Sequence, residues 1–247
     1  MSKFDELYES IMNTENGLTE SINDKNLFKA VFLAGGPGSG KSFIVDKMFS
    51  GLGANLLNSD TAFEHLLAKN NLSKKIDPKN VEQYAQQMAV RSKAKAQTGK
   101  QKGFWIDGML PVIIDGTGKD FDKIKKEKDM LEAIGYDTYM VFVNTTLDVA
   151  YERNKMRERS VPDKVVEQSW NEVQANIGKF QSIFKDGFIV VDNSKALTPD
   201  GVAKLGQDLR KTAIKFINGN VKNRRGVMVI DMLKKIGGKY LSDLTDG

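Results

Sequence analysis

Short apolar runs rich in β-branched residues alternate along the chain with segments whose apolar residues recur at helical spacing. The short runs cover residues 30–34, 55–59, 112–114, 138–143 and 188–191. Helical spacing occurs in residues 41–50, 61–67, 77–91, 122–134, 147–159 and 162–184. Strands that alternate with helices predict a parallel sheet with helices on both faces. We therefore expect a three-layer α/β/α fold around a mostly parallel sheet of five strands.

The two ends of the chain continue this pattern with helices alone. Residues 4–12 carry apolar positions at helical spacing, and we interpret residues 1–29 as an N-terminal helical extension. Residues 30–196 hold the alternating strands and helices, and we interpret them as the core domain. Residues 197–247 predict a mostly helical C-terminal appendage of two or three helices, in which no motif is evident.

Composition removes several kinds of site and fits an enzyme that handles polyanions. The chain has 247 residues, a formal net charge of +5, a single histidine and no cysteine. Disulfides and thiolate metal sites are therefore excluded, and a histidine-built zinc site is disfavoured. No apolar run approaches the roughly 20 residues that span a bilayer. The first residues are polar, unlike a secretory signal, so we expect a cytoplasmic protein with no membrane partner.

The strongest chemical signal is the segment GGPGSGKS at residues 35–42, which fits the phosphate-binding pattern G-x-x-x-x-G-K-[ST] in full. It lies between a predicted strand and a predicted helix, as the pattern requires. Backbone N–H groups of such a loop face phosphate oxygens, while its lysine reaches the β- and γ-phosphates and its hydroxyl binds Mg²⁺. We expect ATP or GTP and Mg²⁺ as cofactors. The expected nucleotide-binding residues of this segment are Gly36, Gly38, Ser39, Gly40, Lys41, Ser42 and Phe43.

Acidic residues follow three predicted strands, at the sheet edge where parallel sheets bind nucleotides. They are Asp60, Asp115 and Asp192. Asp60 has two interpretations of equal weight: it accepts the proton of a substrate hydroxyl, or it caps the next helix.

Asp115 is the expected metal-binding acid, together with Ser42, because it ends a long and uniformly aliphatic run. Asp107 competes for this role. We favour Asp115 because Gly108 follows Asp107 directly, as in a turn.

Three arginines, Arg153, Arg157 and Arg159, crowd one predicted helix end. Arg153 and Arg157 are four positions apart and share a face of that helix. Arginines over a phosphate chain neutralise the charge that grows during phosphoryl transfer. The alternative is a solvated helix face on which they pair with nearby glutamates.

Together these motifs resemble P-loop kinases of the polynucleotide kinase and zeta-toxin group, with chloramphenicol phosphotransferase as a relative. The resemblance spans about residues 30–195. It is carried by GGPGSGKS at 35–42, NSD at 58–60, VIIDGTG at 112–118, YERNKMRERSVP at 151–162 and VVDN at 190–193. It implies transfer of a γ-phosphate from ATP or GTP to a hydroxyl. It further implies Asp60 as the hydroxyl-activating base, Arg153 and Arg157 as lid arginines, and Asp192 and Asn193 near the nucleotide base.

Three functions share these features. The favoured one is a kinase that phosphorylates a hydroxyl of a nucleic-acid 5′ end or of a small metabolite such as a nucleotide sugar. A nucleoside monophosphate kinase and an NTP-driven ATPase or switch are the alternatives. The switch is disfavoured because residues 154–157 lack the aspartate of a guanine motif, and a motor because Gly116 replaces a second acid. The lysine-rich segment 93–102 is interpreted as a solvated helix end and loop rather than as an acceptor site.

Overall fold

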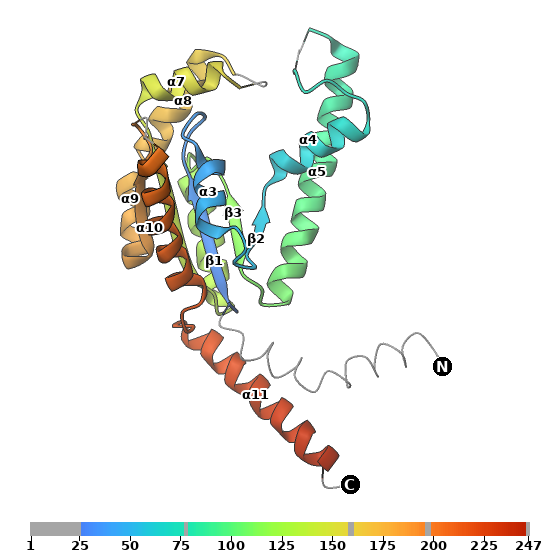
Figure 1. Ribbon diagram of the computed structural model, residues 1–247. Helices are drawn as coiled ribbons and strands as arrows, with labels where there is room; N and C mark the ends of the chain where they lie inside the picture. Colours follow the sequence, from blue (N-terminus) through green and yellow to red (C-terminus); the bar gives the residue numbers. More distant parts are fainter. Residues whose placement is uncertain (1–25, 77–78, 158–160, 196–198, 246–247) are drawn as a thin grey trace.

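Five parallel strands form the centre of the computed structural model, which describes residues 26–76, 79–157, 161–195 and 199–245. The strand order is β2-β3-β1-β4-β5 (Figure 1). The strands are β1 (Lys29–Ala34), β2 (Asn55–Leu57), β3 (Val112–Asp115), β4 (Asp137–Asn144) and β5 (Phe188–Asp192). The predicted α/β/α fold is confirmed, and every strand pair is parallel. Because β3 inserts beside β1, Leu33 pairs with Asp115.

Helices connect the strands, and two of them differ in length from the prediction. The helices are α3 (Lys41–Phe49), α4 (Ser59–Lys69), α5 (Val81–Asp107), α6 (Phe121–Ala133), α7 (Leu147–Lys155), α8 (Asp163–Gln174), α9 (Ile177–Phe184), the 3-10 turn η1 (Lys185–Gly187), α10 (Pro199–Ile217) and α11 (Arg224–Thr245). The expected end of a helix near residue 91 is wrong, because α5 continues to Asp107. The expected helix to residue 159 is also wrong, because α7 ends at Lys155. The helix expected at the start of the chain lies outside the described residues.

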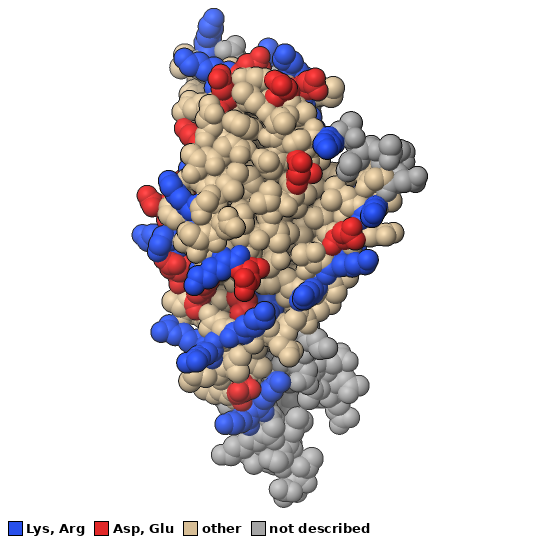
Figure 2. All heavy atoms as spheres, turned by 90° about the vertical axis from the view of Figure 1, so that its left-hand side faces the viewer, with Lys and Arg blue, Asp and Glu red and all other residues tan. Residues whose placement is uncertain are grey.

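The two faces of the sheet have separate cores, and β1 contributes alternate residues to each, as the two-residue period of a strand requires. Phe32 packs on one side with residues of α9 and with parts of α5 and α6. Val31 and Leu33 pack on the other side against α3 and α10. Residues after 197 thus supply one of the helices that cover the sheet. On the side of α9 and α10, basic and acidic side chains are interspersed over the surface (Figure 2).

A third, smaller core joins α4 to α5. It consists of Phe63, Leu67, Val90 and Ala94 and lies apart from the two sheet cores. In Figure 1, α4 and α5 rise on one side of α3, and α7 and α8 rise on the other. The beginning of α3 therefore lies between two helical units, each of which carries candidate site residues.

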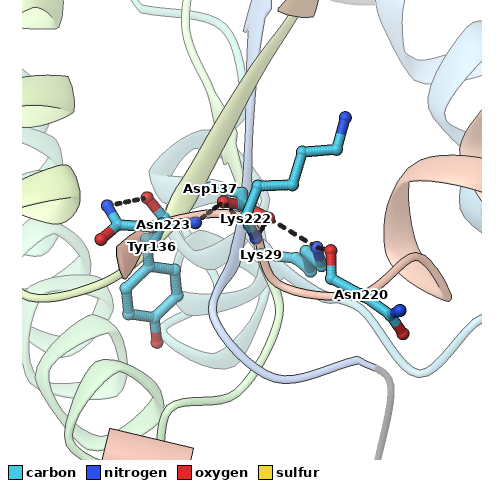
Figure 3. Close-up of polar contacts among 6 residues, drawn as sticks. All are labelled: Lys29, Tyr136, Asp137, Asn220, Lys222 and Asn223. Atoms are coloured by element: carbon cyan, nitrogen blue, oxygen red, sulfur yellow. Dashed lines mark hydrogen bonds and ion pairs between the residues drawn. The ribbon is translucent and has the colours of Figure 1, made fainter. Parts of the chain in front are cut away.

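At the opposite end of the sheet, a buried ion pair ties β1 to β4 (Figure 3). The Lys29 ammonium lies 2.7 Å from Asp137 Oδ2 and also donates to the carbonyl of Asn220. The Asp137 carboxylate accepts the backbone N–H groups of Lys222 and Asn223. These contacts fix the connection between α10 and α11. In the part of the chain that the structure describes, no helix is long and apolar enough to cross a membrane.

Candidate active site

The loop between β1 and α3 has a positive φ, which favours glycine, at three positions: Gly35, Gly38 and Gly40. Gly38 and Gly40 have φ values of +77° and +85°. A Cβ on Gly38 would lie 2.4 Å from the carbonyl oxygen of Ala150, and a Cβ on Gly40 would lie 2.3 Å from Asn193 Nδ2. The loop is therefore packed tightly between α7 and the end of β5. Gly36 is less confined, with the backbone of Trp170 as its nearest neighbour.

Helix α3 begins at this loop without a side-chain cap. Its N-cap residue is Gly40, in the left-handed conformation. The first N–H groups of an α-helix lack partners within the helix, and the positive end of the helix dipole favours anions. An uncapped N-terminus after a glycine-rich loop is an arrangement that binds phosphate. Ser42 and Phe43 lie exposed in the first turn, and the Phe43 ring packs beneath the Lys47 ammonium at 5.7 Å.

Lys41 donates a hydrogen bond from Nζ to the carbonyl of Gly35 at 2.6 Å. Burial lowers the pKa of its ammonium, and the charge of Asp115 is the strongest influence in the opposite direction. Arg157 lowers the same pKa, and Asp60 raises it. Three of the predicted site residues, far apart in the sequence, thus lie close enough to Lys41 to act on its charge.

Asp115 lies at the end of β3, beside the strand that leads into the loop. Its Oδ2 accepts a 2.6 Å hydrogen bond from Asn58 Nδ2. Its Oδ1 is buried, and none of the described residues donates to it. Burial raises the pKa of this carboxyl; Lys41 lowers it and Asp60 adds to the increase. The competing acid, Asp107, ends α5 and influences the pKa of Tyr136, at the end of the sheet away from the loop.

The residues present fit a magnesium ion. Mg²⁺ prefers oxygen ligands and is usually held by one or two side chains together with substrate phosphates. Asp115 Oδ1, to which no described residue donates, and the hydroxyl oxygen of Ser42 are metal ligands of this kind. No group of three or more His, Cys, Asp or Glu side chains among the described residues would bind a metal alone. Ser42, Asp115 and the phosphates would therefore have to bind the ion jointly.

Asp60 is the second residue of α4 and is exposed. The alternative that Asp60 caps this helix is wrong, because Asn58 does so. Asn58 Oδ1 accepts the backbone N–H groups of Asp60 at 2.8 Å and Thr61 at 3.1 Å. Asn58 is also the residue that the sequence analysis missed. Its position directly before a helix, where asparagine is a favoured cap, is the signal that would have identified it.

The two arginines expected above the phosphates lie on the α7 side of the loop. Arg153 Nη1 is buried, has no hydrogen-bond partner among the described residues, and lies 3.6 Å from the Cβ position of Gly40. Arg157 lies beyond the end of α7, so the two do not share one helix face, yet Arg157 still acts on the pKa of Lys41. Arg159 lies outside the described residues.

The buried side-chain amide of Asn154, in α7, makes two hydrogen bonds to the backbone of Val161. Asn154 Nδ2 donates to the carbonyl of Val161 at 2.7 Å, and Asn154 Oδ1 accepts the Val161 N–H at 3.1 Å. These two bonds tie Val161 to α7, which explains why the helix stops at Lys155, four residues earlier than its apolar spacing predicts.

The two residues after the last predicted strand have different surroundings. Asn193 is buried and donates from Nδ2 to the carbonyl of Ser39 at 2.8 Å, so it supports the loop. The Ser39 side chain is itself buried, with no partner for Oγ among the described residues. Asp192 is exposed and accepts a hydrogen bond from Ser194, which lowers its pKa. Asn193 therefore contacts the loop, whereas Asp192 stabilises the turn after β5.

The sequence of residues 31–179 matches the family model described as AAA domain. The chain belongs to the AAA domain family. The match includes the loop, Asp60, Asp115 and both arginines, and ends before Asp192. With its sheet order and its glycine-rich loop, this AAA domain has the α/β fold of a P-loop NTPase.

Solved structures resemble the chain distantly. A gluconokinase from Sinorhizobium meliloti is 17% identical, with a TM-score of 0.44 over 76% of this chain and 95% of that one. A chain from the PezAT toxin–antitoxin system of Streptococcus pneumoniae is 16% identical, with a TM-score of 0.48 over 100% and 99%. A shikimate kinase from Bacteroides thetaiotaomicron is 14% identical, with a TM-score of 0.40 over 74% and 97%. No curated protein matches this AAA domain significantly.

Proposed function

We propose that this AAA domain protein is a phosphotransferase that moves the γ-phosphoryl group of ATP or GTP to a hydroxyl group. One observation carries the proposal. At the uncapped N-terminus of α3, Arg153 Nη1 is buried 3.6 Å from the Cβ position of Gly40 without a partner among the described residues, and Asp115, Arg157 and Asp60 all act on the pKa of the Lys41 ammonium. Hydroxyl phosphorylation requires a phosphate-binding lysine, a metal-binding acid, a general base and a transition-state cation. Lys41, Asp115, Asp60 and Arg157, respectively, fit these four roles.

In the proposed reaction, the loop and the start of α3 bind the phosphate chain through backbone N–H groups. Lys41 Nζ exchanges its hydrogen bond with Gly35 for one with a phosphate oxygen. Ser42, Asp115 and the phosphates would hold Mg²⁺, which would neutralise part of the phosphate charge. Arg153 Nη1, buried and without a partner in the part of the chain that the structure describes, offers a further donor beside Gly40.

The chemical step needs a base for the acceptor. Asp60 takes the proton of the acceptor hydroxyl as its oxygen bonds to the γ-phosphorus; the bond to the bridging oxygen breaks, and the nucleoside diphosphate leaves. A positioned base contributes typically about 10²–10⁴-fold to such a rate. Arg157 stabilises the charge that spreads over the transferring group. A phosphate acceptor would not need this base, because it is already an anionic nucleophile.

The acceptor side of the proposed site is the α4–α5 unit, because α4 carries Asp60 in its first turn. On α5, the Arg91 guanidinium lies 5.7 Å from the ring of Phe63 in α4 and brings a positive charge to this unit. The lysines of residues 93–102 lie within α5 rather than in a loop. Lys93, Lys95 and Lys100 are exposed, whereas Lys102 is partly buried and pairs with Glu127 of α6. We propose a nucleic-acid 5′ end or a small metabolite such as a nucleotide sugar as the acceptor, in the cytoplasm.

Transfer of radiolabelled γ-phosphate tests the proposal. The acceptors are 5′-hydroxyl DNA and RNA ends, nucleotide sugars, nucleosides and nucleoside monophosphates. We expect labelled product with a hydroxyl acceptor, and none with the Lys41→Ala variant. Transfer to monophosphates alone, or hydrolysis that no acceptor changes, would contradict the proposal in favour of the two alternative functions.

Asp60→Asn tests the base separately. We expect about 10²–10⁴-fold slower transfer with unchanged ATP affinity, because only the proton acceptor is lost. Asp122→Asn is the matched control, since Asp122 is likewise the exposed second residue of a helix, α6. Equal rates in the two variants would show that Asp60 is not the base.

A further inference from the structure

One amide side chain contacts both the metal-binding acid and the helix that carries the candidate base. Asn58, between β2 and α4, donates from Nδ2 to Asp115 Oδ2 at 2.6 Å. Its Oδ1 accepts the N–H groups of Asp60 and Thr61. The two halves of the amide therefore connect the end of β3 to the first turn of α4.

We propose that Asn58 is a positioning residue that fixes the orientation of the Asp115 carboxylate for magnesium–nucleotide binding. The inference rests on the metal-binding part of the proposed function. The hydrogen bond occupies Oδ2, and Oδ1 is the buried oxygen of this carboxylate to which no described residue donates. Hydrogen bonds to ionised oxygens are short and strong, which fits the 2.6 Å separation. The acid is held in one orientation before any ligand arrives.

The double contact explains why asparagine suits this position better than other capping residues. Serine and aspartate cap helices about as well, because both offer an oxygen to the first N–H groups. Serine is too short to span from the cap to Asp115 as well, and aspartate would place a second carboxylate against the first. Asparagine alone among these caps combines an acceptor for α4 with a donor for Asp115.

The same side chain holds the first turn of α4, which includes Asp60. Since Asp60 is the second residue of this helix, its position depends on where the helix begins. Asn58 thus couples the acid expected to bind the metal to the residue expected to activate the acceptor. Partners of this kind behind a metal ligand typically contribute about 10–100-fold to metal affinity or activity.

Asn58→Ser separates the two contacts, because it keeps a capping oxygen and removes the donor to Asp115. Asn80→Ser is the matched control: Asn80 caps α5 by accepting the Gln83 N–H at 3.2 Å. Calorimetry measures the ATP dissociation constant with excess Mg²⁺ and again with EDTA. We expect Asn58→Ser to weaken binding about 10–100-fold with Mg²⁺ and to leave binding in EDTA unchanged. Asn80→Ser leaves both values unchanged, and urea midpoints of the two variants shift by similar amounts.

A double variant shows whether Asn58 acts through Asp115. In an Asp115→Asn background, Asn58→Ser should cause no further loss of Mg²⁺-dependent ATP affinity. Losses that simply add, or an Asn58→Ser variant that binds like Asn80→Ser, would overturn the inference, as would a wild-type affinity that Mg²⁺ does not change. These binding measurements need no acceptor. A protein that shows the expected binding pattern but phosphorylates nothing would therefore refute the kinase alone and leave the role of Asn58 intact.

Discussion

Replacing Lys29 by methionine should destabilise the protein by breaking its buried ion pair. The side chains of Lys29 and Asp137 are only 2% and 13% exposed, and their charged atoms lie 2.7 Å apart. Removing one partner of a buried pair costs about 3–5 kcal/mol, because the other charge stays buried without compensation. Asp137 keeps the N–H donors of Lys222 and Asn223, so we expect about 3 kcal/mol, the lower end of this range. Methionine is close to lysine in length, which keeps any cavity small.

Urea unfolding followed by circular dichroism measures this loss. For a chain of this size, about 3 kcal/mol corresponds to a melting temperature lowered by about 6–12 °C. The control is Lys125→Met, which removes an exposed ion pair with Asp129 whose side chains are 48% and 50% exposed. Exposed pairs contribute little, so its midpoint should hardly move. The argument from burial would be refuted if Lys29→Met shifted the urea midpoint no more than Lys125→Met does, while the dependence of the unfolding free energy on urea concentration stayed the same.

Two further predictions concern the loop end of the sheet. Gly38→Ala puts a Cβ 2.4 Å from the Ala150 carbonyl oxygen. The left-handed conformation of this position also costs about 1–2 kcal/mol for any residue other than glycine. We therefore expect calorimetry to show at least about tenfold weaker ATP binding. Gly99→Ala, with nothing within 4 Å, is the control; equal affinities would contradict the packing argument. Asp115→Asn should raise the urea midpoint of the ligand-free protein at pH 8. Burial raises the pKa of this carboxyl from its ordinary value of 3.8. At a pH above the raised pKa the carboxylate is charged, and this buried charge lowers the stability of the folded protein. The gain should vanish as pH falls toward 3.8, where the wild-type acid is also neutral, and a gain that stays constant with pH would contradict this reasoning.

Local patterns predicted the strands and the loop, because both are encoded within a few consecutive residues. The runs that end at Ala34 and Asp115 are buried on both faces of a parallel sheet, which demands continuous apolar residues. The phosphate-binding loop needs glycine at defined positions, which fixes its spacing. The β1–loop–α3 unit could therefore be predicted from local sequence patterns.

The full length of α5 could not be predicted from periodicity, because the second half of this helix has few apolar side chains in contact with a core. After Ala94 its side chains are mainly exposed, and Phe104 is 82% exposed. Only Trp105 and Ile106, near the end of the helix, pack against the sheet core, so this half shows no apolar stripe, and Gly99 and Gly103 further resemble a loop. The end of α7 was missed for a different reason, since it depends on the hydrogen bonds between Asn154 and Val161 and not on apolar spacing.

Contacts between residues far apart in the sequence could not be predicted from local sequence patterns. Asn58 and Asp115 are 57 positions apart, and Lys29 and Asp137 are 108 apart. Each residue has an ordinary local explanation, as a cap, a strand-end acid or a charged strand residue. Only the strand order, which places β2 beside β3 and β1 beside β4, brings the partners together.

Buried charged groups are paired at one end of the sheet and lack partners among the described residues at the other, and this difference indicates where a ligand would bind. At the start of β1, the charges of Lys29 and Asp137 are paired and further hydrogen-bonded. At the loop, Asp115 Oδ1 and Arg153 Nη1 are buried without partners among the described residues. An unpaired buried polar atom costs about 1–3 kcal/mol, so leaving one acceptor and one donor open is expensive in the free protein. A bound molecule would recover that cost only if it offered a cation to the acid and an anion to the arginine, and a magnesium–nucleotide complex offers both.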